Sequence, residues 1–492
     1  MKQNWLDRVI SYVLPKSGAA RAKSRHVIDV MESRAGYDAA GFGRRNTWVR
    51  GADSSQNAEN RRSLTILRAR SRETARNNVY AVSAIDTRVT ATVGEGIIPI
   101  AKHSNPRKAK LANELMQEWA KSTWCDADGC CDLFGLQALI MRSQSESGEA
   151  VLIRQFDNTT TNRVPLRIRL VEGDFIDDMR NGTFDNFEVI QGVALRESAT
   201  GKQRAGYYLH DGHPGELIAH TSSRFVSADQ VAHIFDILRP GQLRGIPPGV
   251  AGLSRMRNLD ELMDAIIEQQ KVSACLVGFI QQGEEGKSNG DVLPSKLEPG
   301  LLAKLGTDES VTFNSLPSLS GQDAIIQKEE HLIAKAYGIN YQSLTGDLSN
   351  ANFSNGKMGR LDMYANVRRW RKNMLITQGM KRIEAWFIEA AVLNGHKIEG
   401  VTFDWTPPRS EILNLRDDIP ALIKQIRSGL GSYSGVARSL GYPDAEALMR
   451  EIKQDADLMD ELELVFDSDP RKTSQSGQLQ SQGQKSEDLT ND

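Results

Sequence analysis

The chain is 492 residues long, which is more than one compact core holds, so two to four structural regions are expected. Hydrophobic residues make up 39% and charged residues 25% of it, a composition typical of a folded protein with much solvated helix surface. The net charge is −2, but residues 1–76 carry 16 Lys and Arg against 7 Asp and Glu, a balance of +9, whereas residues 444–492 carry 5 against 13, a balance of −8. The basic end suits polyanions and the acidic end repels them, although a solvated arm and a solvated tail explain the same charges equally well.

The sequence gives little support for a secreted protein, a membrane protein or a metal-binding protein. The first 18 residues place apolar pairs on one helical face and lack the continuous apolar run of a secretory signal. The longest apolar stretch, at residues 274–280, is far shorter than the roughly 20 residues of a membrane span. Cys125, Cys130 and Cys131 have no second cysteine pair or histidine pair at zinc spacing. We therefore expect reduced thiols, no metal, no cofactor and no membrane partner.

An extended arm and then helices are expected in the first third of the chain. Residues 18–62 alternate Gly, Ala, Asn, Ser and Arg without a period, which is typical of an arm without its own core. From residue 63 to 92, apolar residues recur at helical spacing, and the run stops at Gly94-Glu95-Gly96. Further helices are predicted at 107–119 and 133–146.

A block of strands follows. Leu166, Ile168 and Leu170 alternate with Arg167 and Arg169, which predicts a strand with one apolar and one basic face. Further short apolar or period-2 runs predict strands at 150–156, 187–195, 206–210 and 231–237. Together they indicate a mixed sheet domain, whose basic face is either a nucleic-acid surface or a solvated strand face.

Between residues 233 and 248 the chain reads HIFDILRPGQLRGIPP, which is turn chemistry rather than catalytic chemistry. Next, a long helix is predicted at 250–280, short strands at 276–281 and 311–313, and a helix at 324–337. Residues 338–357 form a polar stretch with no core residues at either period, and a structureless loop of about 20 residues usually has a task. One or two long helices bent at Gly379, helices at 416–427 and 444–464, and a disordered tail from residue 467 complete the chain.

Motifs for nucleotide binding and hydrolysis are absent. Pro99 stands where a dinucleotide loop has its third Gly. Lys357 is followed by Met358 rather than by the Ser or Thr of a P-loop, and Tyr433 stands where a nucleophile elbow has its Ser. We expect no enzyme activity, so an ATP-driven step would belong to a partner.

Five segments, in sequence order, resemble the lambda-type portal proteins of tailed bacteriophages, the head-to-tail connectors. They are ARNNVYAVSAIDTRVTATVGEGI at 75–97, SGEAVLIR at 147–154, HIFDILRPGQLRGIPP at 233–248, LEPGLLAKLGTDES at 297–310 and IAKAYGINYQSLTGDLSNANFSN at 333–355. The resemblance implies an α+β fold that assembles as a ring of twelve subunits around an axial channel.

The resemblance also implies the division of the chain. Behind a basic, partly disordered arm at 1–62 it places a wing of helices and a mixed β-sheet at 63–249. Two stem helices, an outer one at 250–280 and a returning one at 323–337, then flank a small α/β clip at 281–322. A tunnel loop at 338–357, a long wing or channel helix at 358–400, a helical crown at 401–466 and a disordered tail at 467–492 follow.

Three groups of site residues follow from the resemblance. The family signature turn contains Arg239, Pro240, Gly241, Gln242, Arg244, Gly245 and Pro247. The tunnel loop and its flank would present to DNA the residues Asn340, Asp347, Asn350, Asn352, Ser354, Asn355, Lys357 and Arg360. The clip would dock the terminase through Glu298, Pro299, Gly300, Asp308 and Glu309.

The implied function is a passive channel for double-stranded DNA, used in packaging and ejection without sequence recognition. The terminase large subunit would dock first and a head-completion or tail-connector protein later, and the ring would nucleate capsid assembly with the major capsid and scaffold proteins. The protein would act at a capsid vertex of the virion, after assembly in the host cytoplasm. The alternative is a nucleic-acid-binding or processing enzyme that uses the basic arm and the face of Arg167 and Arg169.

Overall fold

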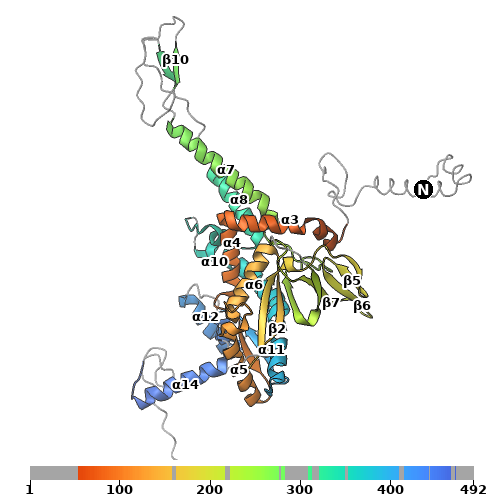
Figure 1. Ribbon diagram of the computed structural model, residues 1–492. Helices are drawn as coiled ribbons and strands as arrows, with labels where there is room; N and C mark the ends of the chain where they lie inside the picture. The colour runs from red at the N-terminus through yellow and green to blue at the C-terminus, as the bar shows by residue number, and fades with distance from the viewer. Residues whose placement is uncertain are drawn as a thin grey trace, which may run out of the picture. The chain divides into compact units, whose positions relative to one another are not determined.

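The computed structural model describes residues 54–157, 162–216, 222–275, 279–282, 309–312, 321–349, 353–408, 415–442, 444–466 and 471 (Figure 1). The chain divides into two compact units, Met1–Ser55 and Gln56–Asp492. Nearly all of the first unit, and with it most of the predicted arm, lies outside the described residues. The arm was predicted to reach residue 62, but helix α3 already begins at Gln56. The fold is α+β.

The run predicted as one helix at 63–92 is two helices. They are α3 (Gln56–Asn77) and α4 (Val79–Val93). Asn78 separates them because its backbone is extended and its side chain accepts a hydrogen bond from the Ala81 amide, which caps α4. Gly94 ends α4 with a positive φ of 52°, as the Gly94-Glu95-Gly96 run predicted.

Two more helices and a small strand pair complete the first part of the core. The helices are α5 (Pro106–Ala120) and α6 (Leu133–Ser147), close to the predicted ranges. Strand β1 (Ile98–Lys102) pairs with β12 (Thr402–Thr406), about 300 residues later in the chain. Strand β12 lies in the range predicted as crown, yet its Phe403 belongs to the main core.

The strand block forms two sheets rather than one. The first has the order β3-β2-β9 and contains β2 (Glu149–Phe156), β3 (Leu166–Glu172) and β9 (Val231–Phe235). The second has the order β4-β5-β6-β7-β8 and contains β4 (Gly182–Phe184), β5 (Phe187–Ile190), β6 (Val193–Ser198), β7 (Gly201–His210) and β8 (Ser223–Ser227).

The prediction of a mixed sheet is wrong, because every ladder between these strands is antiparallel. The physical reason is the short turns that join neighbours in the second sheet. Asp185 and Asn186 both have positive φ, as a two-residue hairpin requires. Gln191 and Gly192 make a second such turn, which splits the strand predicted at 187–195 into β5 and β6.

After the signature turn the chain runs out along α7 (Val250–Cys275) and returns along α8 (Gln322–Tyr337), and these two helices contact each other (Figure 1). The helix predicted to reach residue 280 ends at Cys275, because Phe279–Gln282 pairs as strand β10 with β11 (Glu309–Thr312). Both strands were predicted. Apart from Gly321 and Gln322 at the start of α8, the rest of the clip range lies outside the described residues.

Beyond α8 the chain forms a short helix and then a long helical region that changes type along its length. Short α9 (Tyr341–Thr345) comes first, then α10 (Phe353–Arg369), η5 (Trp370–Met380) and α11 (Lys381–Leu393). The η5 segment has π-helical hydrogen bonding, and the Thr377 hydroxyl likewise donates to the carbonyl of Lys372, five residues back. Gly379 lies within this eleven-residue change of helix type, and the bend expected there stays a prediction.

Three helices close the described chain. They are α12 (Leu415–Arg427), α13 (Tyr433–Ser439) and α14 (Ala445–Glu461). The sequence predicted α12 and α14 but missed α13, whose seven residues are too few to show a helical period.

One hydrophobic core joins residues distant in sequence. It contains Ile85 of α4, Ile140 of α6, Ile234 of β9, Tyr337 of α8 and Phe387 of α11. The predicted wing and the long helical region therefore share a core. In the described part of the chain, every helix is too short or too polar to serve as a membrane span.

Candidate functional site

The signature turn is held by its own glutamine. The Gln242 side-chain oxygen accepts hydrogen bonds from the amides of Leu238, at 2.9 Å, and Arg239, at 3.3 Å. Its nitrogen donates to the carbonyl oxygen of Arg244 at 2.8 Å. One buried amide side chain therefore satisfies three backbone groups that no strand or helix pairs, which is what keeps such a turn folded.

The side chain of Arg244, in the same turn, belongs to a buried ionic cluster. We define this cluster as Arg68, Glu149, His233 and Arg244. All four side chains are almost completely buried. Arg244 donates to Glu149 Oε1 at 2.7 Å and to the carbonyl oxygens of Gln191, at 2.9 Å, and Gly173, at 2.7 Å. The cluster thus joins the signature turn to both sheets.

Glu149 is the centre of this cluster. Its carboxylate accepts hydrogen bonds from Arg68, from Arg244 and from the backbone amide of Gly245, the last at 2.9 Å. His233 Nε2 lies 2.7 Å from Glu149 Oε2 and donates to it. Two guanidinium groups and one carboxylate so far from water are stable only while each has its partners.

Burial changes the acidity of the cationic members. It lowers the pKa of Arg68 to about 9, helped by the charge of Arg244, and the pKa of Arg244 to about 10. Both remain protonated at neutral pH. Burial, followed by the positive charges of Arg204, Arg244 and Arg68, lowers the pKa of His233 well below its ordinary value. His233 is therefore neutral in the folded chain.

Two glycines allow the turn to approach this cluster. A Cβ on Gly245 would lie 2.2 Å from the carbonyl oxygen of Gly148, and a Cβ on Gly148 would lie 2.4 Å from the carbonyl carbon of Ile246. Gly148 also has a φ of +92°, which favours glycine. The motifs containing Gly148-Glu149 and Arg244-Gly245 thus fold against each other.

Helix α3 fastens the turn from the other side. Asn57 receives a hydrogen bond from the Leu243 amide at 3.0 Å and donates to the carbonyl of Gly241 at 2.9 Å. Asn60 donates to the carbonyl of Arg244 at 3.3 Å. Neither asparagine was predicted from the sequence, because both lie in the range 1–62 that was expected to be an extended arm. Arg68 was not predicted either, although it lies one helical turn after buried Leu64.

The segment predicted as the tunnel loop is more ordered than expected. It contains α9, and Ile339 and Leu344 are buried, so the prediction that it has no core residues is wrong. Two core residues five apart fit neither a strand nor a helix period, which explains why they were missed. Helix α10 begins at Phe353, inside the predicted loop.

Two of the polar residues predicted to face DNA hold this segment together. The Asn340 side chain accepts from the Ser343 amide at 3.3 Å and caps α9. Asp347 accepts from the Tyr341 hydroxyl and from the Ser349 amide, both at 2.9 Å. Hydrogen bonds from the Ser349 side chain and amide, and then from Tyr341, lower the pKa of Asp347.

The remaining predicted channel residues lie at the start of α10 or just before it. Asn350 and Asn352 are outside the described residues, and Ser354 and Asn355 lie in α10 without described side chains. Lys357 forms an ion pair with Asp418 of α12 at 3.2 Å. Arg360 lines a cleft of about 1050 Å³ that also borders α4 and α9.

Arg88 anchors the chain where this segment begins. It is fully buried, donates to the carbonyl oxygen of Tyr337 at 2.7 Å and lies 3.8 Å from the ring centroid of Trp370. Burial lowers the pKa of Arg88 to about 10. The end of α8 and the start of η5 are thereby fixed to α4.

Of the predicted clip residues, Glu298, Pro299, Gly300 and Asp308 lie outside the described residues. Glu309 begins strand β11. Terminase docking at these five positions stays a prediction.

The basic strand face that supported the alternative function is not an open one. Arg167 donates to the carbonyl of Asp126 at 3.1 Å, and its guanidinium lies 4.4 Å from the ring centroid of Trp124. Arg169 lies 5.8 Å from the ring centroid of Phe175. Both guanidinium groups pack on aromatic rings of their own chain.

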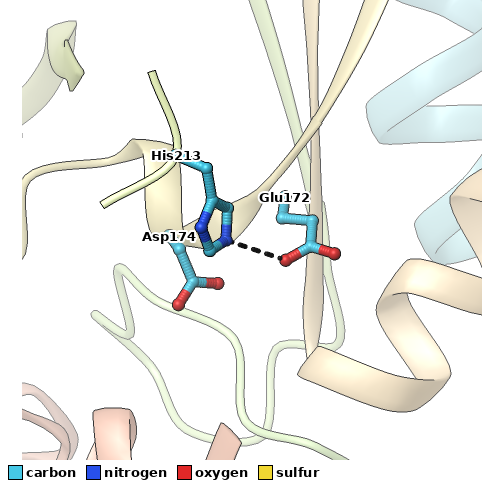
Figure 2. Close-up of side chains that lie close together, drawn as sticks. All are labelled: Glu172, Asp174 and His213. Carbon is cyan, nitrogen blue, oxygen red and sulfur yellow. Dashed lines mark hydrogen bonds and ion pairs between the residues drawn. The ribbon is translucent and has the colours of Figure 1, made fainter. Parts of the chain in front are cut away.

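Among the described residues, one group has the ligand types of a metal site: Glu172, Asp174 and His213 (Figure 2). Arg72 donates to both carboxylates, at 2.5 Å each. Burial alone would raise the pKa of Asp174, but the hydrogen bond from Arg72 and the charges of Arg68 and Arg72 lower it. A guanidinium therefore already occupies the position that a cation would need, and the group does not fit a metal site.

Comparison with known proteins identifies the family. The profile of the family described as "Phage portal protein, lambda family" matches residues 42–371. A curated "Probable portal protein" of Halomonas phage phiHAP-1 is 24% identical over 408 residues, which cover 77% of this chain and 75% of that protein.

Solved structures similar to the chain include the virion of a native gene transfer agent particle, with a TM-score of 0.46 and 15% identity over 78% of this chain and 94% of that one. The HK97-family phage portal protein of Corynebacterium diphtheriae has a TM-score of 0.31 and 9% identity over 69% and 95%.

The matched range includes the signature turn, all five resembling segments and the whole tunnel segment, so the predicted resemblance is confirmed: the chain belongs to the lambda family of phage portal proteins.

Proposed function

We propose that this protein is the portal subunit of a phage particle and that its copies close into a ring around a channel for double-stranded DNA. The observation that carries the proposal is the family match over residues 42–371, within which the signature turn is fastened to both sheets and to α3. A ring under load needs a subunit that keeps one shape. The buried ionic cluster supports this, because a shift of the turn relative to the sheets would leave buried charges unpaired.

The channel would be lined by the segment from Asn340 to Arg360. Its first half is stiffened by α9 and by the hydrogen bonds of Asp347, and Lys357 is tied to α12. Phosphates would be contacted by the few cations at the start of α10, without base-edge contacts and hence without sequence recognition. The near-neutral net charge of −2 suits a duplex that has to slide.

In this proposal the role is structural. The ring, of twelve subunits as in the family, sits at a capsid vertex after assembly in the host cytoplasm. It receives the terminase large subunit at the clip, and later a head-completion or tail-connector protein, and it nucleates assembly of the major capsid and scaffold proteins. The chain's own residues provide anchoring and guidance, and the packaging motor provides the work.

The test is to purify the full chain and image it by negative-stain electron microscopy over a range of salt and protein concentrations. We expect ring-shaped class averages with a central hole wide enough for a duplex. A sample that contains only monomers and dimers under all of these conditions would overturn the proposal. So would hydrolysis of nucleotide or cleavage of DNA by the purified protein alone.

A further inference from the structure

The last helices of the described chain expose apolar faces that nothing in the described part of the same copy covers. In α12, Ile419 and Ile423 are 39% and 43% exposed. In α14, Met449 and Ile452 are 47% and 49% exposed, and none of its residues is buried. Both helices contact α13. An amphipathic helix with an open apolar stripe is typical of a surface that packs against protein.

The stripes are regular. In α12 the apolar positions Ile419, Ile423 and Ile426 follow one another at spacings of four and three. The apolar positions that form the stripe of α14 are Ala445, Leu448, Met449, Ile452, Ala456 and Met459. Each stripe spans at least two turns of its helix, which is the geometry needed for helix-on-helix packing.

The two stripes carry opposite charges beside them. Lys424 and Arg427 lie one and four residues after Ile423, in the last turn of α12. Glu451 and Asp455 border the α14 stripe on one edge and are four residues apart, so their like charges repel each other on an isolated helix. Both pairs are exposed. A cationic helix placed along this edge would remove the repulsion.

We propose that α12 of one copy packs against α14 of the next copy, stripe on stripe, with Lys424 and Arg427 facing Glu451 and Asp455. The inference rests on the proposed ring, because the α12–α14 contact would be one of the subunit contacts that repeat around that ring. A contact between two different faces of identical chains is head-to-tail, and it closes a ring when the rotation between copies divides the circle. A contact of α14 with a second α14 would set Glu451 and Asp455 of both copies together, which charge repulsion disfavours.

The experiment uses charge reversal in full-length protein. The first variant carries Lys424→Glu and Arg427→Glu, and the second carries Glu451→Lys and Asp455→Lys. In each variant both helices have the same sign of charge, so every α12–α14 contact becomes repulsive. At a subunit concentration where the unmodified protein is half assembled, we expect at least a tenfold lower ring fraction for either variant, measured by analytical ultracentrifugation and electron microscopy.

Mixing the two variants identifies the partner. When they are co-expressed and alternate around a ring, each contact again joins opposite charges, and we expect the ring fraction to recover. If the two helices instead met within one copy, each chain would keep its own repulsion and mixing would restore nothing, although the variant with all four reversals would recover. Lack of recovery on mixing would therefore overturn the proposal.

A matched control reverses two charges on the opposite face of the same helix, Asp457→Lys and Glu461→Lys, both exposed. We expect this control to assemble like the unmodified protein. If the first two variants also assemble normally, the α12–α14 contact is refuted while the ring stands. If the unmodified protein makes no rings at all, the proposed function fails first.

Discussion

At the scale of single residues, the main feature of the chain is a cluster of charged side chains buried away from water. Glu149 receives Arg68, Arg244, His233 and the Gly245 amide on two carboxylate oxygens. Such a group adds little net stability compared with a well-packed apolar core, but loss of one partner leaves the others buried and unpaired. The cluster therefore acts chiefly by penalising every arrangement in which the turn, the sheets and α3 do not meet.

The first prediction concerns Glu149. In Glu149→Gln the buried guanidinium groups lose their counter-charge, and we expect the free energy of unfolding to fall by about 3–5 kcal/mol. Urea denaturation followed by circular dichroism measures this. The control is Glu172→Gln, which weakens an ion pair of a half-exposed carboxylate with Arg72 and should cost at most about 1 kcal/mol. Equal losses for the two variants would contradict the structural role of Glu149.

The second prediction concerns pH and His233. Because burial lowers the pKa of His233, the folded chain leaves it neutral while the unfolded chain binds a proton below about pH 6.5. Acidification below that value therefore favours the unfolded state, by about 1.4 kcal/mol per pH unit for one proton. In His233→Gln this contribution disappears, so its loss of stability between pH 6.5 and 5 should be smaller than that of the unmodified protein. Parallel stability curves for the two proteins would contradict the prediction.

At the scale of elements, the glycines decide which segments can touch. Replacing Gly245 by Ala puts a methyl group 2.2 Å from a backbone oxygen that is fixed by β2 and α6, so the turn has to move away from Glu149. We expect Gly245→Ala to lower the free energy of unfolding by about 1–3 kcal/mol. The measurement is again urea denaturation.

The matched control is Gly356→Ala. Gly356 lies in α10 with no atom within 4 Å of an added Cβ, so alanine there should stabilise the helix by about 0.5–1 kcal/mol. The two substitutions have identical chemistry and opposite expected signs. A destabilising effect at both positions would show that contact with Gly148 is not the cause.

The elements also show what sequence reasoning can reach. Helices α5, α6 and α8 were predicted within two residues, because their apolar residues repeat over three or more turns. The break at Asn78 was not predicted, because it depends on a single capping residue. The pairing of β1 with β12 was not predicted either, because it joins strands about three hundred residues apart. The resemblance identified the signature turn, but its partners Glu149 and Arg68 emerge only when distant segments are brought together.

At the scale of the whole molecule, the proposed ring is expected to contact only a few DNA phosphates. Each phosphate neutralised by Lys or Arg adds about 0.9 to the slope of the logarithm of affinity against the logarithm of salt concentration. For a sliding duplex we expect a shallow slope, which Lys357→Ala combined with Arg360→Ala lowers further without dissolving the ring. Fluorescence anisotropy with a linear duplex at several salt concentrations measures it. Lys108→Ala, which removes a surface cation paired with Glu399, should leave the slope unchanged.

The separation of Glu149 and Arg244 by 95 residues also affects how the protein is made. Translation at about 5–20 residues per second needs roughly 5–20 s to cover that distance. During this interval the nascent chain holds a carboxylate and a guanidinium, Glu149 and Arg68, that cannot yet be buried with all their partners. The hairpins from β4 to β8, which need only neighbouring residues, are free to form meanwhile. We therefore expect the five-stranded sheet to form during synthesis before the buried ionic cluster does. A nascent chain on a ribosome stalled before residue 244 should accordingly be sensitive to protease.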